Sequence, residues 1–299
     1  MTISRTTPST SFAQSKRATA HNAAPARPRV MPYRAYDTNG RGKRQPDEPS
    51  SSSLQEIYSL LRTSPPPGAP QAGAAEPRFQ HRRFKSGELI YRMGQTFSVL
   101  YIVRLGFLKT ILRNIQGAER ILSFPMQGDL LGFDGIYHNR YTNDTIALTD
   151  GDLIAIPFKE LLATGHCTDE LGQMIYLAAS REIMLERCGM GLSITVQSEA
   201  RVARFLAMQA KRYTDMGYSS RNFLLPMTRR DLGSYLGLTL ETISRSLSAL
   251  ANAGVIAVNR RDIRILQPEM LTLPADFPPA PERLRKTAAV ADAQPAVVE

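Results

Sequence analysis

Residues 228–266 read TRRDLGSYLGLTLETISRSLSALANAGVIAVNRRDIRIL, and this stretch predicts two short helices, a tight turn between them and a β-hairpin. Thr228 is a favourable N-cap, and the carboxylate of Asp231, three positions on, can reach back to the free N–H groups of the first turn. Gly237 permits the positive φ that a sharp turn needs, and Thr239 begins the second helix. The pattern is a helix–turn–helix followed by a hairpin, here called the wing.

The second helix has two different faces. Its inward face is apolar, with side chains at i, i+4 and i+7: Ile243, Leu247 and Leu250. Its outward face carries a carboxylate, a hydroxyl and a guanidinium near the N-terminal end: Glu241, Ser244 and Arg245. Arginine can bond guanine at O6 and N7, and a carboxylate can accept from the N4 amine of cytosine. The alternative is a solvated face with an i, i+4 Glu–Arg pair, but the surrounding motif favours a DNA-reading helix.

The segment MTRRDLGSYLGLTLETISRSLSAL (residues 227–250) resembles the DNA-binding motif of the CRP/FNR family of bacterial transcription regulators. It is most similar to the FNR-type branch, whose reading helix has an E-x-x-S-R pattern that Glu241, Ser244 and Arg245 match. The cyclic-AMP receptor branch typically has an arginine before this glutamate, where this chain has Leu240. The resemblance implies a two-fold operator with half-sites similar to TTGAT.

The net charge of +10 is unevenly placed. Residues 201–266 hold eleven Lys and Arg against four Asp and Glu, and residues 1–78 hold eleven against five, whereas residues 79–200 hold twelve against thirteen. Positive charge therefore lies on the expected DNA-binding module and on the N-terminal segment, as attraction to phosphates requires. We expect contacts to the DNA backbone from Thr228, Arg229, Arg230, Thr239, Thr242, Arg260 and Arg261.

Both ends of the chain are expected to be disordered. Residues 1–78 form a basic extension with few large apolar residues, which cannot bury enough surface to offset the entropy of ordering. A short helix is possible at residues 54–62, where apolar residues are helically spaced. The basic side chains of the extension either touch DNA phosphates or keep a linker soluble. Residues 271–299 are rich in Pro and Ala and are expected to form a disordered tail.

Residues 79–166 show short apolar segments at regular intervals with glycine-containing turns between them, which is typical of a β-roll or barrel. The expected strands are 88–92, 99–105, 106–114, 120–125, 129–133, 143–148 and 151–156. KSGELIYRMGQTFSVLYIVRLGFLKT and PMQGDLLGFDGIYHNRYTND resemble the sensory domain of the same family. By position alone, the resemblance implies that the loop 114–119 contacts RNA polymerase.

The resemblance also shows which ligand-binding residues this chain lacks. Where cyclic-nucleotide-binding relatives have a glutamate for the ribose, this chain has Phe133. Asn143 and Asp144 stand near the position of the arginine for the phosphate, with only Arg140 nearby. A phenylalanine cannot hydrogen-bond a ribose, and a carboxylate repels a phosphate. A cyclic-nucleotide-responsive regulator is therefore the less favoured alternative.

Oxygen sensors of the FNR branch hold a four-iron–four-sulfur cluster through four cysteines, three in the N-terminal segment and one in the barrel. Ile154 stands at the barrel position, and the two cysteines of the chain are Cys167 and Cys188. Because such a cluster needs four thiolates or close equivalents, we expect no iron–sulfur cluster and no metal. Two alternatives stay open. One is a redox role for a cysteine, and the other is haem with an axial ligand from His81, His138 or His166.

The sequence of residues 167–197 predicts a long helix. Apolar residues at a 3–4 spacing are typical of a coiled-coil seam: Ile175, Ala178, Leu185, Leu192 and Val196. The alternative is an amphipathic helix packed on its own barrel. In the resembled family this helix forms the dimer interface, and a two-fold protein suits a palindromic operator. Residues 198–270 complete a winged helix–turn–helix domain that begins with an amphipathic helix.

The sequence thus predicts an α+β protein with a cyclic-nucleotide-binding-like β-roll, a long dimerisation helix and a C-terminal winged helix–turn–helix. The absence of P-loop, Gly-x-Ser-x-Gly, His-Glu-x-x-His and Cys-x-x-Cys motifs disfavours an enzyme. No apolar run is long enough for a membrane span, no signal peptide is evident, and two cysteines fit a reducing cytoplasm. We expect a cytoplasmic homodimer whose partners are double-stranded DNA and RNA polymerase.

Overall fold

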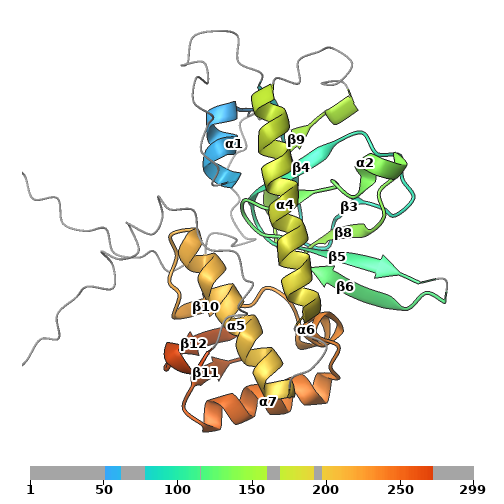
Figure 1. The fold of residues 1–299 in the computed structure, drawn as a ribbon. Coiled ribbons are helices and arrows are strands. Elements are labelled where there is room, and N and C mark those ends of the chain that lie inside the picture. Colours follow the sequence, from blue (N-terminus) through green and yellow to red (C-terminus); the bar gives the residue numbers. More distant parts are fainter. Residues whose placement is uncertain (1–50, 62–77, 115, 160–168, 192–196, 272–299) are drawn as a thin grey trace, which may run out of the picture.

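The computed structural model describes residues 51–61, 78–114, 116–159, 169–191 and 197–271. Figure 1 shows a β-roll with the long helix α4 (Asp169–Gly191) lying along it, and a smaller domain of helices α5, α6 and α7 with a short sheet beyond the end of α4. This order confirms the expected α+β architecture. In the described residues, no helix is long and apolar enough to cross a membrane.

Two antiparallel sheets form the roll, with strand orders β1-β2-β9-β4-β7 and β3-β8-β5-β6. Their strands are β1 (Ser51–Ser52), β2 (Phe79–Phe84), β3 (Leu89–Tyr91), β4 (Leu100–Leu105), β5 (Leu108–Arg113), β6 (Glu119–Ser123), β7 (Leu130–Leu131), β8 (Asp144–Ala147) and β9 (Gly151–Ile156). A short helix, α2 (Gly135–His138), follows β7. The seven strands expected from the sequence correspond to β3 through β9, several of them shorter than expected.

Strand β2 was not expected, because its sequence FQHRRF is mostly polar. Its two ends, Phe79 and Phe84, are buried in the roll. The polar residues between them lie where β2 pairs with β9 in the register His81–Ile154 through Phe84–Gly151. Pairing with β1 and β9, rather than an apolar pattern, therefore makes this segment a strand.

The expectation of disorder for residues 1–78 is wrong for residues 51–61. Strand β1 pairs with β2, and α1 (Leu54–Leu61) packs on the roll through four buried side chains, which confirms the short helix: Leu54, Ile57, Tyr58 and Leu61. The contact is close, since a Cβ at Gly128 would lie 2.4 Å from the carbonyl oxygen of Leu60. The other expectations for residues 1–50, 62–77 and 272–299 fall outside the described residues, whereas Leu271 is buried in the C-terminal domain.

Helix α4 packs against the roll along the side that was expected to form the dimer seam. Ile175 and Ala178, two of the expected seam residues, are 5% and 4% exposed and pack within their own chain in the core of the roll. Leu185 is half-buried, and Leu192 and Val196 fall outside the described residues. The physical reason is that α4 is apolar on two neighbouring sides, and the more deeply buried side faces its own chain.

The C-terminal domain is a winged helix–turn–helix, as expected. Its helices are α5 (Ser198–Asp215), α6 (Arg229–Leu236) and α7 (Leu240–Asn252). A three-stranded sheet follows the order β10 (Asn222–Leu224), β12 (Asp262–Ile265) and β11 (Ile256–Asn259), and a 3₁₀ turn at Pro268–Met270 ends the domain. Strands β11 and β12 form the wing. Strand β10 was not expected, because only its central Phe223 is buried.

Part of the roll joins the hydrophobic core of the C-terminal domain, which is separate from the main core of the roll. Side chains from β5, β6 and the segment after β6 pack with those of α5, α6 and the wing. A buried carboxylate strengthens this junction: Asp129 of the roll forms ion pairs with Arg212 of α5 and Arg181 of α4. The position of the helix–turn–helix is therefore set partly by the roll.

Candidate DNA interface

The first helix of the motif begins as its sequence predicts. The Thr228 hydroxyl accepts from the Asp231 backbone N–H at 3.0 Å, and the Asp231 carboxylate accepts from the Thr228 N–H at 3.0 Å, which completes a capping box. The helix ends at Gly237, with φ of 65°. Gly233 permits the close turn, because a Cβ there would lie 2.6 Å from the Leu238 carbonyl oxygen.

Helix α7 places the three expected base-reading residues on one side. Thr239 caps the helix by accepting from the Thr242 N–H at 3.1 Å. Ile243 and Leu247 are buried, while Glu241 and Arg245 are exposed and Ser244 is half-buried. Hydrogen bonds from its own backbone N–H and from the Thr239 hydroxyl, with the charge of Arg245, lower the pKa of Glu241 below its ordinary value. Glu241 is therefore an ionised hydrogen-bond acceptor at neutral pH.

Arg229, at the first position of α6, reaches across to the reading helix. Its Nη1 donates a hydrogen bond to Ser244 Oγ at 3.2 Å. The side chain that was expected only to contact phosphate thus also contacts one of the expected base-reading residues. Arg229 fixes the orientation of Ser244 while leaving its remaining N–H groups available to a ligand.

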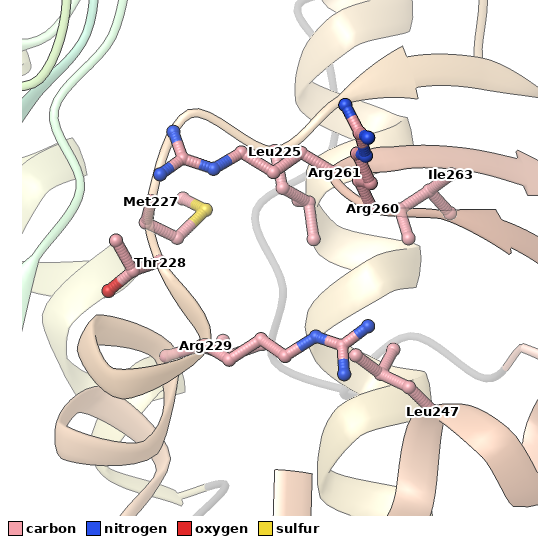
Figure 2. Close-up of a pocket in the computed structure, with 9 residues that line it drawn as sticks. Leu225, Met227, Thr228, Arg229, Leu247, Arg260, Arg261 and Ile263 are labelled. Atoms are coloured by element: carbon pink, nitrogen blue, oxygen red, sulfur yellow. The ribbon is translucent and has the colours of Figure 1, made fainter. Parts of the chain in front are cut away.

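A hollow of about 260 Å³ lies between α6, α7 and the wing. Figure 2 shows Arg229 extending along one side of it toward Leu247, with Arg260 and Arg261 of the wing on the other side. Buried apolar side chains form its floor. Four of the seven residues expected to contact phosphates therefore line one hollow beside the reading helix: Thr228, Arg229, Arg260 and Arg261.

The remaining expected phosphate contacts lie at the starts of the two helices. Arg230 and Thr239 are exposed, and Thr242 is half-buried with its hydroxyl 2.9 Å from that of Thr239. The two wing arginines differ from each other. Arg260 is exposed at the turn with φ of 55°, whereas Arg261 donates from Nη1 to the Pro226 carbonyl at 3.1 Å. Arg261 therefore also holds the wing to the segment before α6.

Comparison with known proteins matches both halves of the chain. A Crp-like helix-turn-helix domain matches residues 200–273, and a cyclic nucleotide-binding domain matches residues 81–164. The transcriptional regulatory protein btr of Bordetella pertussis is 34% identical over 184 residues, which cover 62% of this chain and 76% of that protein. The chain belongs to the CRP/FNR family of transcription regulators.

Two further comparisons agree with this placement of the CRP/FNR regulator. Electron transport regulator A of Shewanella oneidensis is 36% identical over 189 residues, which cover 63% of this chain and 76% of that protein. The structure of FixK2 from Bradyrhizobium japonicum is similar with a TM-score of 0.58 and 25% identity, and the match covers 65% of this chain and 98% of FixK2. The chain is thus a DNA-binding transcription regulator and not an enzyme.

The roll of this CRP/FNR regulator is filled by its own aromatic side chains. The rings of Tyr91 and Tyr141 stack with centroids 4.1 Å apart, and Phe97 packs edge-on against Tyr141 at 5.5 Å. Burial raises the pKa of Tyr141 to about 12, so its hydroxyl stays a neutral donor to the Val99 carbonyl at 2.7 Å. These three rings belong to the buried core of the roll.

The polar side chains around the expected nucleotide-binding positions bond to other groups of the roll. Asp134 accepts hydrogen bonds from the Thr142 N–H and the Asn143 amide, each at 2.9 Å, and from the Thr142 hydroxyl. Asp144 is buried and accepts from the Met93 N–H at 2.7 Å. Arg140 donates to the Gly94 carbonyl at 2.7 Å. The polar groups here are used for structure.

The candidate cofactor ligands are placed apart from one another. His81 contacts two polar side chains. Its Nδ1 lies 3.1 Å from Oδ2 of Asp152, and its Nε2 lies 2.7 Å from Oγ of Ser52. His138 is exposed and packs edge-on against Tyr137, and Ile154 is buried in the roll. Within the described ranges, no three His, Cys, Asp or Glu side chains are grouped to hold a metal. His166 and Cys167 fall outside those ranges.

Sequence reasoning missed one charged contact at this interface. Lys109 on β5 forms an ion pair with Asp231, with Nζ and Oδ1 2.7 Å apart. The two residues are 122 positions apart in the chain, so no local pattern could have revealed the pair.

Proposed function

We propose that this regulator acts as a homodimer that reads a two-fold DNA site with TTGAT-like half-sites. In each subunit Arg245 would read a guanine, Glu241 its partner cytosine, and Ser244 a neighbouring base pair. The observation that carries the proposal is the shared face of α7, on which Glu241 and Arg245 are exposed directly beside the arginine-lined hollow. The FNR-type pattern of these residues supports the choice of half-site.

The phosphate contacts follow from the same face. The hollow offers the cations Arg229, Arg260 and Arg261 around an apolar floor, so a sugar–phosphate backbone would be held by charge while the bases face α7. Arg230 and the hydroxyls of Thr228, Thr239 and Thr242 would add contacts at the two helix N-termini, which favour anions.

An exposed apolar stripe on α4 supports the dimer. Tyr176 and Leu177 are 76% and 56% exposed, and Ile183 and Met184, seven positions later, are 42% and 39% exposed. This heptad spacing is typical of a seam between two helices. We therefore assign the seam to these four residues, in place of the buried Ile175 and Ala178.

The packing of the roll supports regulation without a cyclic nucleotide, since the rings of Tyr91 and Tyr141 are buried in it and the half-buried Asp134 is hydrogen-bonded within it. We likewise propose that neither an iron–sulfur cluster nor haem is held, because His81 is engaged by Asp152 and Ser52 and Ile154 is buried. The turn 114–119 between β5 and β6, exposed at its described residues 114 and 116–119, is the proposed contact to RNA polymerase, at promoters in the cytoplasm.

Selection of DNA from a random pool by the purified protein tests the proposal. The expected result is an inverted repeat of TTGAT-like half-sites whose centres are about one helical turn, roughly 34–36 Å, apart. A Glu241→Ala/Arg245→Ala double variant is the control and should enrich no sequence while keeping non-specific binding. A single half-site, or enrichment by the double variant equal to that by the parent, would contradict the proposal.

A further inference from the structure

The β-roll contributes a charged side chain to the start of the helix–turn–helix. Lys109 Nζ lies 2.7 Å from Asp231 Oδ1, and the two side chains are only 20% and 12% exposed. Asp231 uses its other oxygen, Oδ2, for the backbone N–H of Thr228 at 3.0 Å and for the Thr228 hydroxyl at 2.6 Å. One carboxylate thus joins the roll to the cap of α6.

A second contact on the same side of α6 holds the helix to the roll without charge. Ser234, one turn after Asp231, accepts a hydrogen bond at Oγ from the Ile121 N–H at 3.1 Å and lies 3.5 Å from the Glu119 carbonyl oxygen. Since β6 is an outer strand of its sheet, Ser234 takes the place of a further strand partner. Besides their apolar packing, the roll and α6 are therefore joined by a charged contact and by a neutral hydrogen bond, which can be removed separately.

The carboxylate of Asp231 stands directly beside groups that are proposed to meet a phosphate. It is in hydrogen-bond contact with Thr228, which lines the hollow with Arg229. Burial opposes ionisation of Asp231, but hydrogen bonds from Lys109 and Thr228 outweigh it and lower the pKa below its ordinary value. Asp231 is therefore charged at neutral pH, and an uncompensated negative charge at this place would repel a bound phosphate.

We infer that Lys109 of the β-roll is a positioning residue of the DNA interface: it compensates the charge of Asp231 and so lets the N-terminus of α6 accept a DNA phosphate. The inference rests on the proposed phosphate contacts of Thr228 and Arg229. It makes the roll part of the electrostatics of DNA binding, in addition to its mechanical link through Ser234.

Five variants of the full-length protein separate the possible roles of Lys109. Lys109→Met leaves the Asp231 charge uncompensated, Asp231→Asn removes that charge, and Lys109→Met/Asp231→Asn removes both. Ser234→Ala loosens the same interface without changing charge. Lys109→Arg keeps the positive charge. Affinity is measured for the selected palindrome and for unrelated DNA over a range of salt concentrations, and thermal unfolding checks that each variant is folded.

The inference predicts opposite effects of the two single charge changes. Lys109→Met should weaken binding to both DNAs about three- to tenfold at low salt, and less at high salt, because a nearby charge acts on any phosphate and is screened by ions. The other four variants should bind DNA with an affinity within about twofold of that of the parent, or more tightly: Asp231→Asn, the double variant, Ser234→Ala and Lys109→Arg. Equal losses for Lys109→Met and Asp231→Asn would overturn the inference, since the pair would then matter only as a mechanical link.

A matched pair within the roll controls for net charge. Lys85 and Asp150 form an ion pair of the same length, 2.7 Å, between two turns of the roll. Lys85→Met and Asp150→Asn change the net charge by the same amounts and should leave DNA affinity within about twofold of the parent. If Lys85→Met weakened binding as much as Lys109→Met, a general charge effect would replace the inference.

One further variant distinguishes failure of the inference from failure of the proposed phosphate contacts. Arg229→Ala should weaken binding to both DNAs if the N-terminus of α6 meets a phosphate. If Arg229→Ala weakens binding and Lys109→Met does not, only the role of Lys109 is refuted. If neither does, the phosphate assignment on which the inference rests is refuted as well.

Discussion

Arg229 Nη1 donates a hydrogen bond to Ser244 Oγ across 3.2 Å and so joins the first residue of α6 to the reading face of α7. A side chain that contacts both a phosphate and a base-reading residue couples the register of the backbone to the reading of sequence. Arg230, the next residue, is exposed at the same end of α6. Because both residues carry one positive charge, Arg230→Ala is a control of equal charge for Arg229→Ala.

Arg229→Ala is expected to change the base preference at the pair next to the guanine as well as the overall affinity, because Ser244 loses the donor that orients it. The cost should be about 1 kcal/mol, as for one hydrogen bond. Arg230→Ala should lower affinity without changing preference. Binding to a set of sites with each base at that pair is the measurement, and identical profiles for the two variants would contradict the role of Arg229.

The two wing arginines should behave differently. Arg260→Ala is expected to weaken binding to all sequences alike and to reduce the slope of log K against log salt by about one per site, because one phosphate contact is lost. Arg261→Ala should in addition lower the free energy of unfolding by about 1 kcal/mol, because the bond to the Pro226 carbonyl is lost. Salt titrations and urea unfolding check both expectations. Equal unfolding free energies for the two variants would refute the structural role of Arg261.

The exposed apolar stripe on α4 should be required for dimer formation. Leu177→Glu/Met184→Glu places charges in the proposed seam and is expected to give a monomer in sedimentation equilibrium, with much weaker binding to a palindrome. Ile175→Ala is the matched control on the inner side. It should lower the free energy of unfolding by about 2–5 kcal/mol, as loss of a buried aliphatic side chain does, while the protein stays a dimer. If Ile175→Ala dissociated the dimer and Leu177→Glu/Met184→Glu did not, the seam would lie on the side of Ile175 instead.

The capping box of α6 should make stability depend on acid. Hydrogen bonds from Lys109 and Thr228 hold the pKa of Asp231 below its ordinary value. The folded state therefore gains stability that is complete above the unfolded pKa and is lost as the pH falls through the lower, folded pKa. In urea unfolding at about pH 5, the free energy of unfolding of the parent should exceed that of Asp231→Asn by about 1 kcal/mol. This difference should shrink by about pH 3. A difference that stays constant with pH would contradict this linkage.

Features that depend on residues within a few positions of one another could be predicted from the sequence. The Thr228–Asp231 capping box, the turn at Gly237 and the cap at Thr239 all form as expected, because each needs only its near neighbours. The glycine turns of the roll likewise have positive φ. The division of α7 into a buried face with Ile243 and Leu247 and an outer face with Glu241 and Arg245 follows directly from helical spacing once the helix is placed.

Features that depend on residues far apart in the chain could not be predicted from the sequence. A 3–4 spacing shows that α4 is apolar, but not which of two adjacent stripes, Ile175 with Ala178 or Leu177 with Met184, meets the roll. Strand β2 exists because β1 and β9 pair with it, although its own sequence is polar. The Lys109–Asp231 pair joins residues from two domains, and nothing in either neighbourhood indicates the other.

The most direct test of sequence-specific reading is the affinity of Arg245→Ala for the TTGAT palindrome, compared with a palindrome in which the guanine pair of each half-site is replaced. The parent should prefer the intact site. The variant should lose about 1–3 kcal/mol on the intact site, bind both palindromes equally and keep the non-specific affinity of the parent. If Arg245→Ala binds the intact palindrome as tightly as the parent and still discriminates the guanine, Arg245 does not read this base and the reading face assigned to α7 is wrong.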